Sequence, residues 1–505
     1  MLEMWNYSLC LRVNFVQDCC MRKRFELQLA LGATPIEEVK IPTRTRDELP
    51  PTLAALQWVF TTPEVSAEVF NLLEEELLSD NNSKGRVGMD LWQILVLGVV
   101  RLTLDINYDR LLHVANYDSL VRQLLGQPAF DMELEFKLST LKDNVALLSD
   151  ELLEKINTVI VGHGGGCIKK KEAGLALKVD SYVFESNVHF PTDLSLGLDS
   201  ARKCIVLSAR LSQRHALGGW RKHANWQSKI KRLCRSCARA CRNGGKNKAA
   251  RIEMTAGAYL ESLYALEQKV LISLGQLGRL PSSPQLLIEI SELKGYYEML
   301  IRQIILIGDR LLQGRTIHAH EKLYSIFEQH TEWIQKGKAR PRVELGHRLL
   351  IVTDQYGIVH KYKIMHGGDE AAEVAPLADR LIGKLGLEKI ASLSFDRGFS
   401  SIENRELLEL CMPETEVVMP KKGKLSAADK ERESQKHWRV LANKHSAVES
   451  TINSLEHHGL DRCPDKGYPG YARYAALGIL AYNLHRIGNH LIKAQKRADT
   501  LGRAA

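Results

Sequence analysis

The chain has 505 residues, which is too long for one ordinary hydrophobic core, so about two to four domains are expected. Hydrophobic residues make up 45 % and charged residues 26 % of the sequence, as in soluble globular proteins. The apolar runs are far shorter than the ~20 residues of a membrane helix, and their length excludes a membrane protein. The net charge of +9 is a moderate basic excess, and its distribution along the chain carries more information than its size.

The N-terminal residues do not have the pattern of a targeting segment. Residues 1–20 lack the basic start and the continuous apolar core of a signal peptide, and Met21 is a second candidate for the start of the protein. The ten cysteines are scattered without the regularity of a disulfide framework, which fits reduced thiols in a cytosol. We therefore expect a cytoplasmic protein.

Residues 49–160 are predicted to be helical. Their apolar residues recur at spacings of three and four, with prolines near the helix starts. Residues 87–126 divide into three short helices, which suit a helix-turn-helix-like DNA-binding unit and suit a small helical bundle equally well. The glycines at 164–166 indicate a hinge. We expect an all-α N-terminal domain over residues 1–165, with DNA binding as its role.

A basic segment follows. Residues 200–252 contain fifteen Lys or Arg and no Asp or Glu. A solvated helix face normally mixes both signs, so this segment indicates a polyanionic partner, of which nucleic acid is the usual one. An idle basic surface is the alternative. The expected DNA contacts include three arginines at helical spacing: Arg232, Arg235 and Arg239. Three cysteines lie between them: Cys234, Cys237 and Cys241. A single cluster of this kind is a weak zinc signal.

Short β-prone runs appear from residue 174 onward. Strands are predicted at 174–184, 346–354, 358–365, 389–395 and 415–420. Long helices are predicted over 253–335, and shorter ones at 370–386, 401–411 and 444–457. This order is that of the ribonuclease H-like fold, provided that residues 201–340 are a helical insertion. We expect an α/β domain with a mixed sheet over residues 174–200 and 341–495.

Three carboxylates occupy informative positions in this order. Asp180 lies in the first predicted strand, Asp396 ends the fourth, and Glu449 lies on the last helix. The first and fourth strands of a ribonuclease H-like sheet are neighbours, so Asp180 and Asp396 should lie side by side. Adjacent carboxylates repel each other, and a hard divalent cation relieves that repulsion. We expect the three residues to bind two Mg²⁺ ions, or Mn²⁺ as a substitute, for phosphodiester chemistry.

Five segments resemble the DDE transposases of bacterial insertion sequences: KVDSYVFESNVHFPTDLSLG, SIFEQHTEWIQKGKARPRVELGHRLLIVTDQYGIV, SFDRGFSS, VVMPKKGKLS and AVESTINSLEHHGLDRCPDKGYPGYARYAALGILAYNLHRIG. The resemblance extends at lower density over residues 30–495. It implies that Asp180, Asp396 and Glu449 are the catalytic triad and that Mg²⁺ is the cofactor. It also implies double-stranded DNA, at transposon ends and target, as the partner of a homodimer or higher oligomer associated with the bacterial nucleoid.

The chain departs from that family around the glutamate. Many relatives carry Tyr, Arg and Lys at fixed offsets, where this chain has Ala442, His445 and Glu456. His445, one helical turn before Glu449, could replace in part the basic contact to the cleaved phosphate. The departure bears on the formation of a hairpin at the DNA end and not on the triad.

Other residues have competing interpretations. The loop lysines Lys421, Lys422 and Lys424 follow a strand that should end near the carboxylates, so we expect phosphate contacts there, with a solvated loop as the alternative. Asp354 precedes Gln-Tyr-Gly and is expected to cap a turn. Asp193 is expected to cap a helix, with a minor metal role left open.

Three functions remain in competition. The first is a metal-dependent transposase that hydrolyses a phosphodiester at the transposon end and transfers the freed 3′ hydroxyl to target DNA. The second is a catalytically silent DNA-binding protein, such as a repressor or domesticated transposase. The third is a structure-specific nuclease. The intact Asp, Asp and Glu favour the first over the second, and the long basic insertion favours it over the third.

Overall fold

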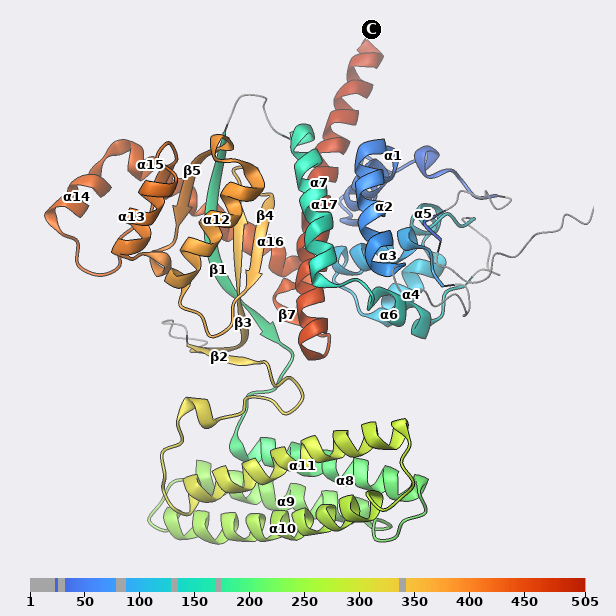
Figure 1. The fold of residues 1–505 in the computed structure, drawn as a ribbon, viewed down its shortest axis with the longest axis vertical. Helices are drawn as coiled ribbons and strands as arrows, with labels where there is room; N and C mark the ends of the chain where they lie inside the picture. The colour runs from blue at the N-terminus through green and yellow to red at the C-terminus, as the bar shows by residue number, and fades with distance from the viewer. Residues whose placement is uncertain are drawn as a thin grey trace, which may run out of the picture.

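The structure is a computed structural model that describes residues 23–25, 32–78, 88–128, 135–168, 174–335 and 342–504. The architecture is mixed α/β, with a helical part on one side, a mixed sheet on the other and a separate bundle of helices below them (Figure 1). The candidate start at Met21 lies outside the described residues. Among those residues no single helix is long and apolar enough to cross a membrane, and only one bent pair of helices passes that test together.

The N-terminal helices pack around one central helix. Their bounds are α1 (Leu49–Thr61), α2 (Pro63–Leu77), α3 (Leu91–Thr103), α4 (Tyr108–Tyr117), α5 (Ser119–Leu124), α6 (Leu138–Val145) and α7 (Asp150–Ile168). Local signals set their starts, because prolines stand in the first turns of α1 and α2 and Asp90 forms a capping box with Gln93 at the start of α3. Gln93 is the one residue of α3 that is not buried, so α3 is the core of this part.

The predicted hinge at residues 164–166 is wrong. Helix α7 runs through these glycines without a break and ends at Ile168. The reason is packing, because a β-carbon on Gly164 would lie 2.5 Å from Cδ1 of Ile487. The missing side chain lets α7 approach the C-terminal helix closely.

That C-terminal helix, α17 (Gly467–Ala504), joins the sheet to the N-terminal helices. It packs against α1, α3 and α7, and its tyrosines Tyr471 and Tyr474 also contact Phe184 in the sheet. One continuous hydrophobic core includes residues of α1 to α7, of the sheet and of α17. The division at residue 165 therefore does not separate two cores.

The sheet has seven strands in the described part of the chain. They are β1 (Leu175–Ser186), β2 (Glu332–Gln335), β3 (Val343–Thr353), β4 (Val359–Ile364), β5 (Ile390–Phe395), β6 (Glu416–Val418) and β7 (Arg462–Cys463). β3 forms antiparallel pairs with β1 and with β4. β5 forms parallel pairs with β1 and with β6. The five predicted strands are confirmed, whereas β2 and β7 were not predicted.

Different helices cover the two faces of the sheet. On one face Leu177 and Val179 pack against α12 (Val374–Leu385) and α13 (Ile402–Cys411). On the other, Tyr182 and Phe184 share a core with α16 (Ala447–Leu455) and α17. Successive side chains of a strand point to opposite faces, so Asp180 shares the α16 face with Tyr182.

The helix predicted over 444–457 is divided in the structure. Helix α15 (Lys436–His445) ends before Ser446, and α16 starts at Ala447. A further helix, α14 (Ala427–Ser434), precedes α15.

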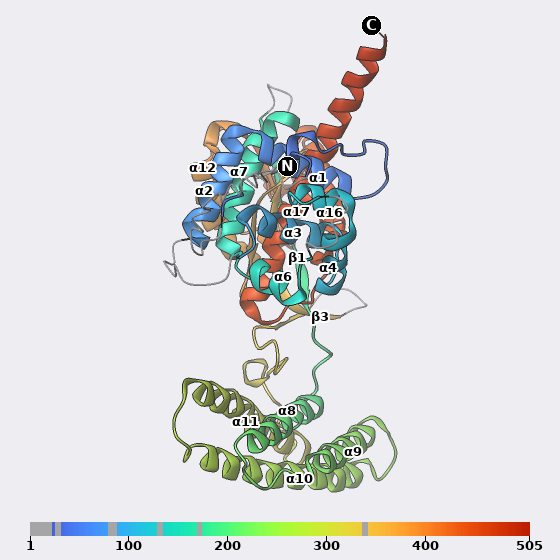
Figure 2. The ribbon, with the colours of Figure 1, turned by 90° about the vertical axis from the view of Figure 1, so that its right-hand side faces the viewer.

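The insertion is a bundle of four helices with its own core. They are α8 (Asp193–Arg214), α9 (His223–Arg242), α10 (Lys248–Leu277) and α11 (Pro284–Leu311). Figure 2 shows the bundle projecting from the sheet, joined to it by the segments after β1 and before β2. Helices occupy most of the predicted insertion, residues 201–340, but the bundle begins earlier, at Asp193, and ends at Leu311. A largely irregular segment and β2 follow it, where the sequence had predicted helix to residue 335.

Candidate active site

The pairing of β1 with β5 brings Asp180 and Asp396 together. Val179 of β1 is the register partner of Phe395 of β5, and the two strands are parallel. The next residue on each strand is therefore an aspartate, and the two aspartates are neighbours. Asp396 follows β5 directly and begins a short 3-10 turn at Arg397–Phe399.

Glu449 approaches the same place from the α16 side. It lies in the first turn of α16, which packs against β1 through the buried side chain of Val448. Burial raises the pKa of Asp180 to about 7, and the negative charges of Asp396, Glu370 and Glu449 add to the effect. The backbone N–H of Ser181 donates to Asp180 and opposes this shift. The site thus concentrates negative charge around one half-buried carboxyl.

Glu370 is a fourth carboxylate at this site that the sequence did not indicate. It lies in a 3-10 turn (Glu370–Glu373) before α12, and it accepts a hydrogen bond of 2.6 Å from the Ser181 hydroxyl. Arg348 lies 3.3 Å from the same carboxylate. A β-carbon on Gly398 would lie 1.8 Å from Glu370, so the glycine after Arg397 leaves room for it. No spacing pattern in the sequence distinguishes Glu370 from Glu373.

His445, the last residue of α15, lies against β5 near the triad. Its Nδ1 lies 3.0 Å from the Ser394 hydroxyl, which donates its own proton to the carbonyl of Leu177. Ser394 therefore accepts from His445 Nδ1–H, and Nε2 carries the lone pair. That Nε2 is buried and has no hydrogen-bond partner among the described residues. Burial lowers the pKa of His445, although Asp396 and Glu449 oppose the shift. A neutral ring at neutral pH does not supply the cationic phosphate contact expected from the sequence.

A cleft lies beside the carboxylates on the α16 side of the sheet. Its volume is about 570 Å³, and it is lined by β1, β5 and the junction of α15 with α16. Lys178, Lys444 and Ser450 are among the lining residues, and Ser450 follows Glu449 directly. The Lys178 ammonium already donates a hydrogen bond to the carbonyl of Asp354, so the cleft borders the triad mainly through Ser450.

The three loop lysines differ in their surroundings. Lys421 is half-buried, and its ammonium lies 2.5 Å from Asp429 of α14. Lys422 and Lys424 are exposed, and neither forms an ion pair with a described residue. Lys421 therefore anchors the loop after β6 to α14, whereas the other two present their charges to solvent.

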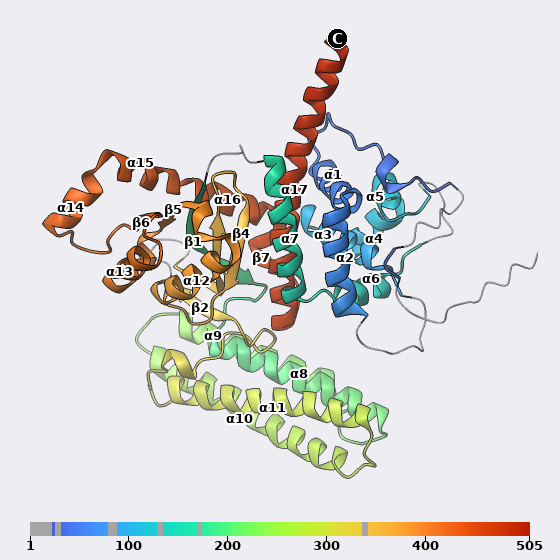
Figure 3. The ribbon, with the colours of Figure 1, turned by 45° about the horizontal axis from the view of Figure 1, so that its top comes forward.

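The basic residues of α9 form an exposed face. Arg232, Arg235 and Arg239 are exposed and have no ion pair within the described ranges, whereas Cys234 and Cys237 point into the bundle core. Burial raises the pKa of the Cys237 thiol to about 12, which disfavours the thiolate form that zinc binds. Figure 2 shows α9 and α16 on the same side of the molecule, and Figure 3 shows α9 below the sheet.

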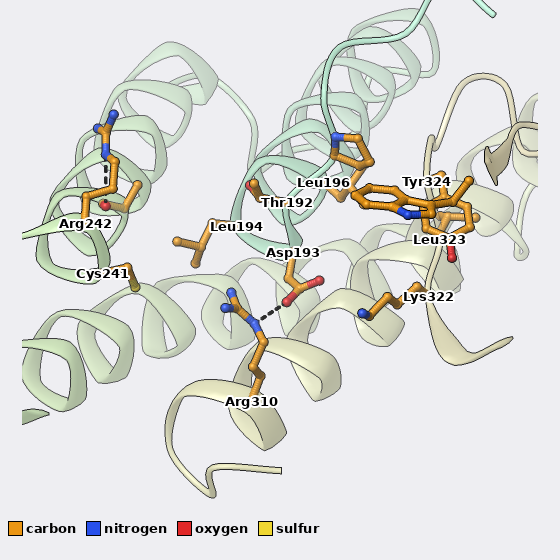
Figure 4. A pocket seen from close by; sticks show the side chains of 13 residues that line it. Thr192, Asp193, Leu194, Leu196, Cys241, Arg242, Arg310, Lys322, Leu323 and Tyr324 are labelled. Atoms are coloured by element: carbon orange, nitrogen blue, oxygen red, sulfur yellow. Dashed lines mark hydrogen bonds and ion pairs between the residues drawn. The ribbon is translucent and has the colours of Figure 1, made fainter. Parts of the chain in front are cut away.

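A second pocket lies where the bundle meets the sheet (Figure 4). Its volume is about 570 Å³, and Arg242 at the end of α9 lines it together with Lys322 and Trp333 of β2. Asp193 lines it too, and it forms an ion pair with Arg310 that leaves it little capacity to bind a metal. The C-terminal end of the basic helix α9 thus reaches the junction with the sheet.

The expected turn at Asp354 is confirmed. Its Oδ1 accepts hydrogen bonds from the backbone N–H groups of Tyr356 and Ile358, and its Oδ2 lies 3.0 Å from His360 Nε2. Gly357 has a φ of +76°, a conformation that glycine adopts without strain. Asp354 is a structural residue of the β3–β4 turn.

Comparisons with family models, with curated proteins and with solved structures gave no match for this chain.

The raised pKa of Asp180 predicts a stability effect that depends on pH. An unfolded aspartate titrates near pH 4, so the folded protein holds the extra proton between about pH 4 and 7, and its stability falls as the pH rises through this window. Asp180→Asn removes the titrating group. Without divalent metal, the variant should be more stable than the wild type by roughly 1–3 kcal/mol at pH 8 and nearly equal to it at pH 4.

Urea unfolding at pH 4, 6 and 8 in a chelator measures this difference. Asp379→Asn, which changes an exposed carboxylate of α12, is the matched control and should show little dependence. A difference for Asp180→Asn that is constant over the three pH values would contradict the assignment of the shift to this carboxyl.

Proposed function

We propose that the chain is a DDE-type DNA transposase, in which Asp180, Asp396 and Glu449 bind Mg²⁺ for hydrolysis and strand transfer at DNA ends. The observation that carries the proposal is the parallel register of β1 and β5, which makes Asp180 and Asp396 neighbours with Glu449 close by. These are the three residues that the resemblance to insertion-sequence transposases had indicated.

The arrangement of the strands supports a ribonuclease H-like catalytic domain. β1, β3 and β4 form an antiparallel succession, and β5 and β6 continue the sheet in parallel from the other side of β1. The first and fourth of the predicted strands are thus neighbours, as that fold requires. The bundle α8–α11 lies in the connection between β1 and β3, which are the first and second of the predicted strands.

The donor set at the triad fits a hard divalent cation. The candidate ligands are carboxylate oxygens, which Mg²⁺ prefers, and the charges around Asp180 that raise its pKa are all negative. A bound cation would reverse this repulsion and favour the ionised form of Asp180. When bound, Mg²⁺ supplies positive charge that activates the attacking oxygen and stabilises the leaving oxygen.

The remaining residues have roles that follow from their places. The unprotonated Nε2 of His445 is available to accept a proton beside the triad, and Glu370 with Ser181 holds the segment next to Asp180 in place. Phosphates of double-stranded DNA would bind the exposed arginines of α9 and the loop lysines Lys422 and Lys424. Strand transfer to target DNA would require at least a pair of ends, so we propose a homodimer or higher oligomer on DNA.

A cleavage assay on the wild type tests the function. The substrate is a duplex that carries the DNA flanking the gene, with Mg²⁺, Mn²⁺ or a chelator. We expect cleavage that leaves a 3′ hydroxyl and joined products with either metal, and neither in the chelator, where a gel shift persists. Binding without cleavage in both metals would instead establish a silent DNA-binding protein, and cleavage without joining would establish a nuclease.

A further inference from the structure

A second cluster of potential ligands lies apart from the triad, at the junction of the sheet with the bundle. It consists of Glu332 on β2, His347 on β3 and His366 after β4, whose ligand atoms all lie within 4.8 Å of one another. The register explains the cluster, because Glu332 pairs with Gly346 and so lies beside His347. His347 is itself the partner of Phe184, four residues beyond Asp180 on β1.

A chain of hydrogen bonds extends behind His347. Its Nε2 lies 3.0 Å from Nδ1 of His330, and Nε2 of His330 lies 3.2 Å from Glu328. Glu328 also accepts a hydrogen bond of 2.8 Å from the backbone N–H of Gly467 at the start of α17. The buried ring of His347 is therefore connected through His330 to an anchored carboxylate.

The number of protons that this chain of hydrogen bonds can hold indicates which group binds Nδ1 of His347. Nδ1 of His347 lies 3.2 Å from the carbonyl of Met365 and 3.4 Å from Glu332. Hydrogen bonds to Glu328, between the rings and to Met365 would need three protons, whereas two neutral imidazoles carry two. With a cation at Nδ1 of His347, both rings are neutral and every nitrogen has a partner. Chains of the form carboxylate–histidine–metal are a common arrangement behind metal ligands.

The other two candidate ligands are also held in place. The backbone N–H of Gly367 donates a hydrogen bond of 2.7 Å to Glu332, and the ring of His366 lies 2.8 Å from the hydroxyl of Tyr468. The first contact joins β2 to the segment after β4, and the second joins that segment to α17. That segment reaches Glu370 beside the triad within four residues.

We infer that Glu332, His347 and His366 form a binding site for a divalent transition metal, with Zn²⁺ as the ion that the donor set fits best. Two imidazole nitrogens and one carboxylate oxygen suit zinc and its neighbours in the first transition series, whereas Mg²⁺ prefers oxygen ligands throughout. Three protein ligands leave a position for water. The ion fastens β2, where the chain returns from the bundle, to the segment that carries Glu370. The site does not depend on the proposed transposase function.

Metal retention by the full-length chain tests this site. The protein is stripped with a chelator, supplied with Zn²⁺, passed through a desalting column and analysed for bound metal. We expect one retained Zn²⁺ per chain in the wild type and in Asp396→Asn, which alters only the carboxylate site. His366→Ala should lose the ion, whereas His113→Ala, an exposed histidine of α4, should keep it.

Two further measurements keep the result independent of misfolding. His330→Gln leaves all three ligands in place and should weaken Zn²⁺ binding by about 10–100-fold. Co²⁺ bound in place of Zn²⁺ should give visible absorption bands that disappear in His366→Ala, while its far-ultraviolet circular dichroism stays that of the wild type. Retention of Zn²⁺ by His366→Ala at the wild-type level, or no retained Zn²⁺ in the wild type, would overturn the assignment.

Discussion

Replacing Asp396 by asparagine should reduce DNA cleavage by roughly 100-fold or more while DNA binding survives. Asparagine keeps the size and hydrogen-bonding capacity of the side chain and removes the negative charge that would hold Mg²⁺ beside Asp180. The exposed arginines that we propose as phosphate contacts lie on a different element, α9, so their charges are unchanged. Loss of one negative charge near the phosphates could even tighten binding slightly.

The measurement is cleavage of a flanking-DNA duplex in Mg²⁺ and in Mn²⁺, beside a gel shift on the same DNA. Asp379→Asn on α12 makes the same chemical change at an exposed position and should cleave as the wild type does. Normal cleavage by Asp396→Asn would show that the triad assignment is wrong. Parallel loss of binding would mean that the substitution damages the fold.

Reversing the charges of Arg232, Arg235 and Arg239 to glutamate should strongly weaken DNA binding. Each phosphate contact that is lost should flatten the dependence of log K on log salt by about 0.9. The three side chains are exposed and lie opposite the buried face of α9, so the bundle should keep its fold. The measurement is binding of one duplex at several salt concentrations.

A matched pair of variants separates a local effect from a change in total charge. The double variant Arg235→Glu/Arg239→Glu is compared with Arg279→Glu/Lys294→Glu, which changes two exposed basic residues, one just after α10 and one on α11. Both lower the net charge equally, and only the first should change the salt dependence. Equal slopes for the two variants would mean that α9 is not the phosphate-binding face.

The neighbouring positions of Asp180 and Asp396 could be predicted because both have a strong local signal. Asp180 and Asp396 stand within or directly after buried apolar runs, and parallel strands place equivalent positions side by side. The short strands β2 and β7 have four and two residues, too few for a periodic pattern. Their existence depends on pairing with β3 and β1, which the sequence does not display.

Other parts of the site depend on contacts between distant segments. Glu370 reaches the triad because a 3-10 turn aims it at Ser181, and nothing in its neighbourhood marks that turn. Glu332, His347 and His366 meet only because of the register of β2 with β3 and the length of the β3–β4 hairpin. The hinge predicted at residues 164–166 was wrong for a related reason, since the small size of Gly164 serves packing against Ile487 in a continuous helix.

The ion pair between Asp193 and Arg310 has a consequence for folding. It joins the first turn of α8 to the last turn of α11, so the chain leaves the bundle close to the point where it came in. Pairing of β1 with β3 closes a loop that contains the whole bundle, and the entropy lost in closing a loop increases with its length. Once the four helices have formed, their ends are already near each other and the loop is effectively short. Assembly of the bundle before the central strands therefore has the lower entropic barrier, and the local contacts within its helices favour the same order.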